Sequence, residues 1–377
     1  MDGQRIELLD VIRGFSLLGI FFVNMPSFHS PNLYINPMDW WNTPIDRSLN
    51  AIIDVMLQAS CYPLFSLLFG YGLASIYKNS KKENLNFSLI ASRRLGFLLL
   101  IGIAHVLFIW HGDILISYAI VGTISAFLLS WPAVKLLRTG IIMYVFPNVL
   151  LACQFFFLKG NNNRVSGVDE VKNSLKIYAQ GTFHDITLQR IHDWQMANDS
   201  LSFLLFFTTI MPFMLIGMAL AKTKFAEQQR IRKRSFFYLF IPALLLKCVP
   251  YFFGWNIMSH FIQDIFGGPL LGASYAFLLS LLLKNQYCAG IIKALAPVGR
   301  MSLSNYLFQS FASTLIFYHY GLGLYGQVSL AEGDVLVVAL FIAQMLFSRY
   351  WMERHTYGPI EWIWRSVTFV KIPKWGK

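Results

Sequence analysis

A histidine inside an apolar segment, His105, and an aspartate shortly after it, Asp113, are the residues best suited to chemistry. Imidazole titrates near neutral pH and is the usual general base in enzymes. A carboxylate that holds the second ring nitrogen would fix the tautomer of the ring, as in hydrolase triads. The two residues can meet only if the chain folds back after His111-Gly112. We expect a catalytic pair, with a packed structural histidine as the alternative.

Polar residues at the ends of apolar segments form two more candidate sites. Asp10 and Arg13 stand three residues apart on one helical face, so they can pair, or Arg13 can contact a phosphate-bearing ligand. Arg300 precedes a polar stripe with helical spacing, which either joins helices through hydrogen bonds or lines a channel. The stripe consists of Ser302, Asn305 and Gln309.

Small residues between Ser66 and Gly72 permit the close approach of another helix or of a ligand. Tight helix packing is the favoured interpretation, and a ligand contact by Ser66 is the alternative.

Two further patterns resemble known sites but lack the context that those sites need. Gly321, Gly323 and Gly326 have the G-x-G-x-x-G spacing but follow no strand, which excludes the nucleotide fingerprint. The pairs His184-Asp185 and His192-Asp193 do not share one helical face, so no metal site is predicted.

The elements that must position these residues are transmembrane helices. Hydrophobic residues make up 56% of the 377 residues and charged residues only 13%. Continuous apolar runs predict an all-α, polytopic transmembrane bundle of about ten helices, as one integral membrane domain over 1–377. A broken or re-entrant piece is expected at Gly267-Gly268-Pro269. The expected helices are 8–25, 51–77, 95–110, 114–131, 141–158, 201–221, 236–253, 270–283, 303–319 and 335–351.

The distribution of charge predicts the orientation of this bundle. The net charge is +12, and most Lys and Arg residues fall in segments that would share the cytoplasmic side. This is the positive-inside pattern, so both termini are placed in the cytoplasm and nucleic-acid binding is not expected. The protein is expected in the cell (plasma) membrane. Residues 160–200 form the predicted extracytoplasmic loop region, with His29 in an earlier external stretch, and 352–377 a cytoplasmic interfacial tail.

Several of these motifs together resemble the YeiB-like membrane proteins, domain-of-unknown-function family 418, over nearly the whole chain. The resemblance is carried by residues 9–20 through Asn24, 64–70, His105 with 110–119, 299–306 and 358–365. These proteins are similar, more distantly, to transmembrane acyltransferases such as the lysosomal heparan-glucosaminide acetyltransferase and bacterial O-acetyltransferases.

The resemblance implies that an acyl group, such as acetyl, moves from cytoplasmic acyl-CoA to an acceptor across the membrane. Arginines at the inner mouth would then hold the CoA phosphates, because guanidinium groups bind phosphate in a bidentate manner. His105 would be the general base or a transient acyl carrier, with Asp113 as its orienter; His29 is the other candidate histidine. The implied cofactor-binding residues are Arg13, Arg93, Arg94, Arg300, Asn305 and Ser66.

Two other classes of function remain open at this stage. A transporter or exporter of a small molecule or lipid fits the helical body and the interrupted helix. The composition is also compatible with a non-catalytic subunit of a membrane complex. The expected partners are the lipid bilayer and an acyl acceptor such as a cell-surface sugar or lipid. Composition leaves the oligomeric state open, a homodimer included.

Overall fold

The computed structural model describes residues 7–158, 167–223 and 233–376, and the regular elements of these ranges are all helices. The first half contains α1 (Glu7–His29), α2 (Pro37–Trp40), α3 (Pro44–Met56), α4 (Cys61–Lys82), α5 (Phe87–Phe108), α6 (Leu115–Phe127), the 3-10 turn η1 (Leu128–Ser130), α7 (Ala133–Leu158), α8 (Val168–Gln180) and α9 (Phe183–Ala197). The second half contains α10 (Ser200–Thr223), α11 (Lys233–Lys247), α12 (Val249–Phe253), α13 (Ile257–Phe261), the π-helical turn η2 (Ile262–Gly267), α14 (Gly268–Lys284), α15 (Ala289–Lys293), α16 (Leu295–Arg300), α17 (Ser302–Phe317), α18 (Leu330–Arg354) and α19 (Pro359–Phe369). The predicted all-α class is therefore confirmed.

Seven helical segments of the described chain are long and apolar enough to cross a membrane. They are Glu7–His29, Pro44–Lys82, Phe87–Phe108, Ala133–Phe157, Arg234–Phe253, Ile257–Lys284 and Leu330–Arg354. Two shorter apolar helical stretches, Leu115–Ser130 and Phe207–Thr223, lie between them in sequence. These segments are those of a multi-pass membrane protein, whereas the total of about ten spans stays a prediction.

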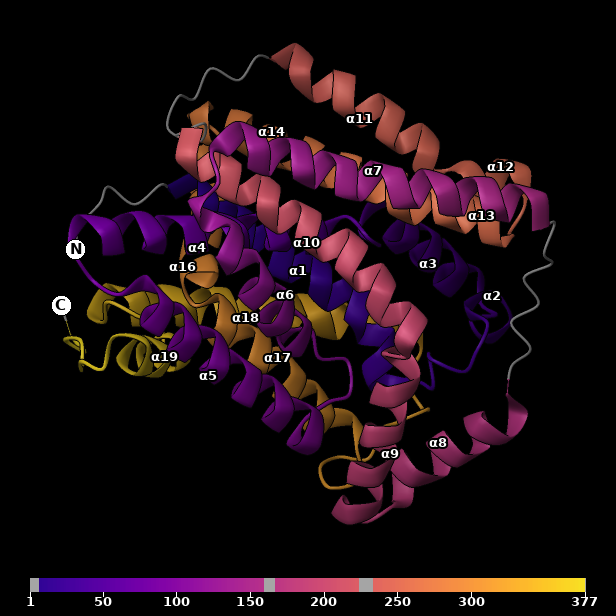
Figure 1. Cartoon of the computed structure of the whole chain (residues 1–377). Coiled ribbons are helices and arrows are strands. Elements are labelled where there is room, and N and C mark those ends of the chain that lie inside the picture. The colour runs from indigo at the N-terminus through magenta and orange to yellow at the C-terminus, as the bar shows by residue number, and fades with distance from the viewer. Residues whose placement is uncertain (1–6, 159–166, 224–232, 377) are drawn as a thin grey trace.

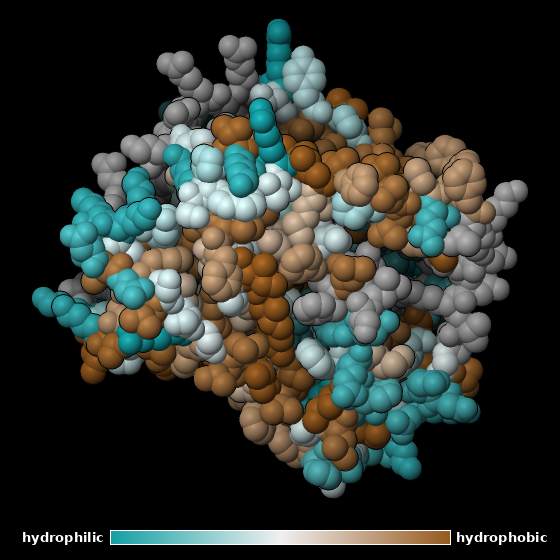
Figure 2. Space-filling view, viewed as in Figure 1, coloured by the Kyte–Doolittle hydropathy of each residue, from teal (hydrophilic) through white to brown (hydrophobic). Residues whose placement is uncertain are grey.

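The molecule has two chemically different ends (Figure 1). Both chain ends and α19 lie on one side, called here the terminal side, whereas α8 and α9 lie at the opposite end, called the cap side. Hydrophobic side chains cover much of the face between these ends, and hydrophilic ones gather toward them (Figure 2). Large apolar residues of α7, including Phe146 and Phe157, are exposed on the molecule. Such a surface suits hydrocarbon rather than water.

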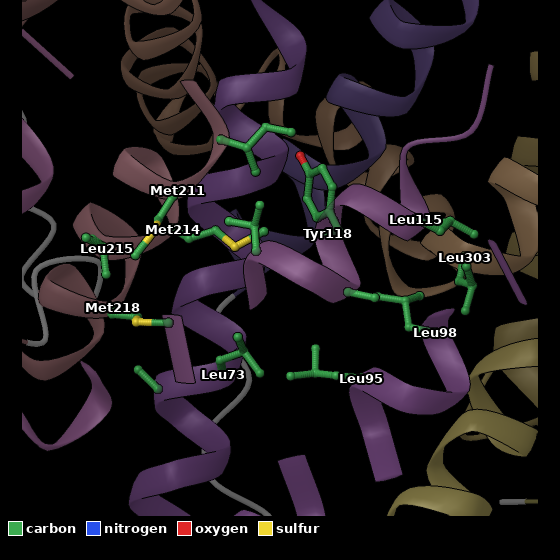
Figure 3. Close-up of a cluster of buried hydrophobic side chains, with 14 of the residues drawn as sticks. Leu73, Leu95, Leu98, Leu115, Tyr118, Met211, Met214, Leu215, Met218 and Leu303 are labelled. Atoms are coloured by element: carbon green, nitrogen blue, oxygen red, sulfur yellow. The ribbon is translucent and has the colours of Figure 1, made fainter. Parts of the chain in front are cut away.

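The main core joins α4, α5, α6, α10 and α17 (Figure 3). Leucines from α4 and α5 meet three methionines of α10, and Tyr118 of α6 lies among them. Methionine fits irregular gaps because its side chain is unbranched and flexible. The labelled residues are Leu73, Leu95, Leu98, Leu115, Tyr118, Met211, Met214, Leu215, Met218 and Leu303.

Two of the expected spans differ from the prediction. The span expected over 51–77 breaks between α3 and α4, where Ala59 has a φ of 57°. The break expected near Gly267 is not present: α13, the π-helical turn η2 and α14 follow one another without a gap as one helical path, Ile257–Lys284. Gly268 and Gly272 bring this path against the interruption between α3 and α4: a Cβ would lie 2.5 Å from the Ala59 carbonyl and 2.3 Å from that of Ser60.

Other helix boundaries differ from the predicted ones for local reasons. The Asn86 side chain caps α5 by accepting from the Leu89 N–H, so Arg93 and Arg94 lie within the helix rather than before it. Helix α1 continues beyond Met25, through Pro26, to His29, which was expected in an external stretch. The region 160–200 is not only a loop, because α8 and α9 occupy most of its described part.

Candidate functional site

His105 and Asp113 meet at the hairpin between α5 and α6. Nδ1 of His105 lies 3.1 Å from Oδ1 of Asp113, and both side chains are fully buried. The distance is that of an ion pair, but the angle is not that of a hydrogen bond. Apo active sites often hold their catalytic groups slightly out of line. The fold-back that the sequence required is therefore present, while its catalytic role stays a prediction.

Two glycines make this fold-back possible. A Cβ on Gly102 would lie 3.0 Å from Oδ2 of Asp113 and 2.9 Å from the Ile116 nitrogen, so only glycine lets α6 begin so close to α5. A Cβ on Gly112 would overlap the Trp110 indole at 2.2 Å. Asp113 also accepts a hydrogen bond from the Ile116 N–H at 2.8 Å, which fixes its carboxylate at the start of α6.

Aromatic rings enclose the imidazole. The ring of Tyr306 lies 5.3 Å from that of His105, and Trp110 lies 6.3 Å away at nearly a right angle. The Tyr306 hydroxyl donates to the Gly112 carbonyl at 3.2 Å and so ties α17 to the hairpin. Within the described part of the chain, Nε2 of His105 has no hydrogen-bond partner. The ring is therefore held by its aromatic neighbours and by its contact with Asp113.

Helices α8 and α9, together called the cap, dock over the hairpin. Asp193 of α9 is buried and accepts hydrogen bonds from Tyr34, Tyr178 and Gln189, at 2.6, 2.6 and 2.7 Å. Burial, together with Asp193, raises the pKa of both tyrosines, so they stay neutral donors. The cap is thus packed against the core.

The cap also contacts the hairpin directly. Arg190 is fully buried and donates to the Ile109 carbonyl at 3.1 Å. Nδ1 of His111 lies 3.8 Å from Oδ2 of Asp193. Burial lowers the pKa of His111, although the Asp193 charge opposes that effect. The Thr182 and Asp185 side chains form a capping box at the start of α9, which accounts for one of the His-Asp pairs of the sequence.

His29, the other candidate histidine, lies at the end of α1 and not beside Asp113. Its ring is fully buried, 5.5 Å from Trp41 and 5.4 Å from Phe317. Neither ring nitrogen has a hydrogen-bond partner among the described residues. Phe28 stacks against Trp110 at 4.1 Å, so aromatic rings separate the two histidines. His29 is buried like His105, but in the described part of the chain no carboxylate lies within ion-pair distance of its ring, although the charges of Asp46 and Glu332 act on it.

On the terminal side, several of the predicted phosphate-binding residues come together. Arg13 pairs with Asp10 at 2.9 Å, as the spacing predicted. Arg94 lies close enough to Arg13 and Arg365 for their charges to repel its guanidinium, which stacks on Trp364 at 3.7 Å. The charges of Arg13 and Arg365 both act on Arg94, so this part of the terminal side is positive, although Asp10 offsets the charge of Arg13.

The other predicted cofactor-binding residues have separate surroundings. Arg93 is exposed, and Arg300 donates to the Thr356 carbonyl at 3.5 Å. Asn305 is buried and donates to the Val298 carbonyl and the Ser348 hydroxyl, at 3.1 and 3.0 Å. The Gln309 amide reaches the Gln344 oxygen of α18, so the polar stripe joins α17 to α18. The Ser66 hydroxyl is hydrogen-bonded to Tyr118 at 2.7 Å, a contact between α4 and α6.

Sequence reasoning missed several residues that build these sites. Tyr306 was read only as part of a motif, and Arg365 only as part of a basic tail. Glu361 accepts from the Leu303 and Ser304 N–H groups and so caps α17 from another helix. Burial raises the pKa of Glu361, while these hydrogen bonds oppose the shift. A glutamate inside an apolar segment was the available signal, since such a group needs partners.

The described residues contain no group of three or more His, Cys, Asp or Glu side chains that could hold a metal ion. His192, from the second His-Asp pair, is exposed and contributes only a 3.8 Å contact to Asp193.

The helices and buried ionisable pairs together define a polytopic, all-helical membrane protein with a histidine-aspartate pair in its interior. The family described as "Protein of unknown function (DUF418)" matches residues 195–371. The chain is 31% identical to "Uncharacterized protein YxaH" of Bacillus subtilis (strain 168), over 98% of this chain and 96% of the relative. It is 29% identical to "Uncharacterized protein YeiB" of Escherichia coli (strain K12), over 97% and 96% of the two chains.

A third relative, "Uncharacterized 39.9 kDa protein in amylase 3'region" of Bacillus acidopullulyticus, is 24% identical over 97% of this chain and 94% of the relative. The chain belongs to the YeiB-like DUF418 family, as its motifs predicted.

Proposed function

We propose that this protein is a membrane-embedded acyltransferase that uses cytoplasmic acyl-CoA and delivers the acyl group to an acceptor from the cap side. The observation that carries the proposal is the His105–Asp113 pair, 3.1 Å apart and fully buried among aromatic rings. A carboxylate beside Nδ1 keeps the proton on that nitrogen and leaves the lone pair on Nε2.

In the proposed reaction His105 acts as the general base. Nε2 takes the proton from an acceptor hydroxyl or amine while the acceptor oxygen or nitrogen attacks the thioester carbonyl. The carbon–sulfur bond then breaks, and the imidazolium returns the proton to the departing CoA thiolate. Asp113 stabilises the transient positive charge of the ring. Atoms and charge balance without a metal or another cofactor.

The arginines of the terminal side would hold the CoA phosphates. Arg94 and His105 lie on the same helix, eleven residues apart, which is about 17 Å at the helical rise. An extended pantetheine arm is long enough to cover such a distance. Leu98, Leu115 and Leu303 belong to the core along this stretch (Figure 3), so the arm would have to displace side chains between α5 and α17.

The geometry narrows the predicted set of binding residues. Arg13 and Arg94 are retained, and Arg365 joins them, because the charges of Arg13 and Arg365 both act on Arg94. Arg300 is the last residue of α16 and follows Gly299. Gly299 and Gly14 let the backbones of α16 and α1 touch. For Asn305 and Ser66, the hydrogen bonds to other helices support a structural role instead. We place the protein in the plasma membrane with both termini in the cytoplasm, in agreement with the charge distribution.

The experiment is label transfer from radioactive acetyl-CoA. Purified protein in nanodiscs is mixed with the donor and with lipid and glycan fractions of the cell envelope as acceptors. We expect saturable acetyl-CoA binding that weakens at least tenfold in Arg94→Gln and Arg365→Gln, and transfer of label to one fraction. Lys135→Gln, a cation that lies over Trp131, is the control for loss of surface charge. Absence of binding at millimolar donor would contradict the proposal.

Transport of a small molecule or lipid is the second candidate function. It is favoured by the interruption at Ala59, which packs against the π-helical turn before Gly268, because transporters often bind their substrate where helices are discontinuous. Flux through proteoliposomes in the absence of CoA would favour this candidate over acyl transfer.

A further inference from the structure

An apolar cavity of about 280 Å³ lies among helices α1, α4, α10 and α14. These four helices belong to the apolar helical segments of the chain, so the walls of the cavity are at the depth of the hydrocarbon core. Apart from Tyr71 and Ser280, the side chains that line it are apolar. Apolar cavities stay dry, so a hydrocarbon ligand suits this one better than water or an ion does.

Close helix contacts produce the cavity. Helix α10 touches α4, because a Cβ on Gly217 would lie 1.9 Å from the Leu67 carbonyl oxygen. Helix α14 touches the chain just before α4, where a Cβ on Gly272 would lie 2.3 Å from the Ser60 carbonyl oxygen. Backbone contacts thus fix α10 and α14 on α4, and the small side chain of Ala273 leaves the space between them open.

The cavity has the length of one leaflet. Its lining on α14 extends from Pro269 to Ser280, which are eleven residues or about 16 Å apart at the helical rise. The hydrocarbon core of a bilayer is about 30 Å thick, so one leaflet contributes about 15 Å. Leu8 of α1 and Leu220 of α10 line the cavity near the ends of their helices on the terminal side (Figure 1). The cavity therefore matches a lipid chain of the leaflet on the terminal side.

The size of the cavity restricts its occupant to a single chain. Small-molecule sites have volumes from about 300 Å³ upward, so this cavity is at the lower limit of that range. An α-helix with its side chains is about 10 Å across and is too wide for it. The cavity is partly open, so a flexible chain can enter it without unfolding the bundle.

Basic residues lie beyond the end of the cavity on the terminal side. Ser280 and Lys284 are four residues apart and share a face of α14, and the Lys284 side chain is exposed. Lys293 of α15 lies 3.6 Å from Glu7, the residue before Leu8, and both of these side chains are 52% exposed. The two lysines carry more charge than Glu7 offsets. Positive charge at the membrane surface attracts anionic lipid headgroups.

We propose that this cavity binds one hydrocarbon chain of an anionic phospholipid, with the phosphate of the headgroup near Lys284 and Lys293. The methyl end of the chain lies near Pro63 and Pro269. Because the helices enclose the chain, this lipid stays bound when detergent replaces the surrounding bilayer. The inference is independent of the proposed acyl transfer, since α5 and the hairpin contribute no residue to the lining.

Photo-crosslinking of the full-length protein in nanodiscs tests the site. The probe is phosphatidylglycerol with a diazirine near the methyl end of one chain, and peptide mass spectrometry locates the label. We expect the label to concentrate on residues 63–71 and 269–280. The comparison surface is α7, where Phe146 and Phe157 are exposed. Labelling of α7 as strong as that of these two segments would overturn the proposal.

Variants that fill the cavity assign the label to it. Ala273→Phe should be labelled about tenfold less on α4 and α14, because its ring takes the volume that the chain needs. Ala339→Phe, on an exposed face of α18, should be labelled like the wild type. If Ala273→Phe fails to fold, Ala276→Leu makes a smaller addition to the same wall and should also reduce the label. Wild-type labelling of a folded, filled variant would overturn the proposal.

Native mass spectrometry after transfer from nanodiscs to detergent tests the headgroup. The probes are phosphatidylglycerol and phosphatidylcholine with the same chains. We expect the wild type to retain phosphatidylglycerol preferentially, and the double variant Lys284→Gln with Lys293→Gln to lose that preference. Lys135→Gln, which alters a lysine over Trp131, should keep it. Equal retention of both lipids by the wild type would overturn the anionic headgroup, and loss of both would overturn the enclosed site.

Discussion

The His105–Asp113 pair and the Lys247–Asp264 pair both lie between apolar helices, yet they are built differently. In the first, both side chains are fully buried, aromatic rings surround the imidazole, and the cap lies over the hairpin. In the second, Asp264 is 33% exposed, and the pair lies where the interruption between α3 and α4 meets the π-helical turn η2. The first pair is therefore enclosed, whereas the second has a carboxylate at the surface of the molecule.

The two regions also differ in how closely their helices pack and in which groups their backbone atoms bind. At the hairpin, Gly102 and Gly112 let α5 and α6 approach closely, and Asp113 serves as both carboxylate and helix cap. In the second region the chain is not helical between α3 and α4, and the Gln58 carbonyl there accepts a hydrogen bond from the Lys247 ammonium. Close helix packing thus encloses the first pair, while the interruption between α3 and α4 supplies the second pair with a backbone oxygen.

The largest expected effect is on acyl transfer by Asp113→Asn. The amide can still accept from the Ile116 N–H, so the start of α6 is kept. The charge that orients and supports His105 is lost, and the transfer rate should fall by roughly 10²–10⁴-fold. Label transfer under single-turnover conditions measures this. The Lys247→Arg variant, which is altered in the other region, should transfer the label at the wild-type rate. Equal losses of transfer rate in the two variants would contradict the distinction between the two regions.

A smaller effect is expected when the cap is loosened. Asp193→Ala removes the acceptor of Tyr34, Tyr178 and Gln189 and leaves buried donors unpaired. We expect a loss of about 3 kcal/mol of stability. Hydrogen exchange should rise first in α8 and α9, while exchange in α11 and α14, which surround the Lys247–Asp264 pair, stays unchanged. His192→Ala, which alters an exposed neighbour, should change neither quantity.

Removal of the Glu361 side chain, which binds the first N–H groups of α17, should lower the stability moderately. Glu361→Ala leaves the N–H groups of Leu303 and Ser304 without their acceptor, at a cost of about 1–2 kcal/mol. Denaturation of the variant should show this loss. Glu353→Ala, on an exposed helix face, should remain within about 0.5 kcal/mol of the wild type.

The smallest predicted effect concerns pH at the hairpin. Burial lowers the pKa of His111 in the folded protein, so the unfolded chain binds more protons near the ordinary histidine pKa of about 6.5. Stability should therefore fall as pH drops below that value toward the lowered one. His111→Gln should flatten the pH dependence of the melting temperature between pH 7 and pH 5. An unchanged slope would show that His111 is not the group responsible.

Much of the fold could be predicted from the sequence, because continuous apolar runs identify helices. The sequence also predicted two contacts that the structure contains: Asp10 with Arg13, from their spacing, and His105 with Asp113, from the fold-back at Gly112. Helix boundaries were less accurate: Asn86 caps α5 before the two arginines, and the positive φ of Ala59 divides a run of residues that looked continuous.

Contacts between distant segments could not be predicted in this way. Nothing local links Glu361 to Ser304, Asp193 to Tyr34, or Lys247 to Gln58. Each of these is a buried polar group that found its partner on another helix, because an unpaired group inside an apolar bundle is costly. A charged or polar residue in an apolar segment shows that it needs a partner, but tertiary packing determines which residue that partner is.

The central claim is that His105, supported by Asp113, is the reacting histidine. Its most direct test is acetyl transfer from labelled acetyl-CoA by wild type, His105→Ala and His29→Ala, at equal amounts of folded protein. The account predicts donor binding in all three, with transfer lost in His105→Ala and retained in His29→Ala. Transfer retained in His105→Ala would contradict it.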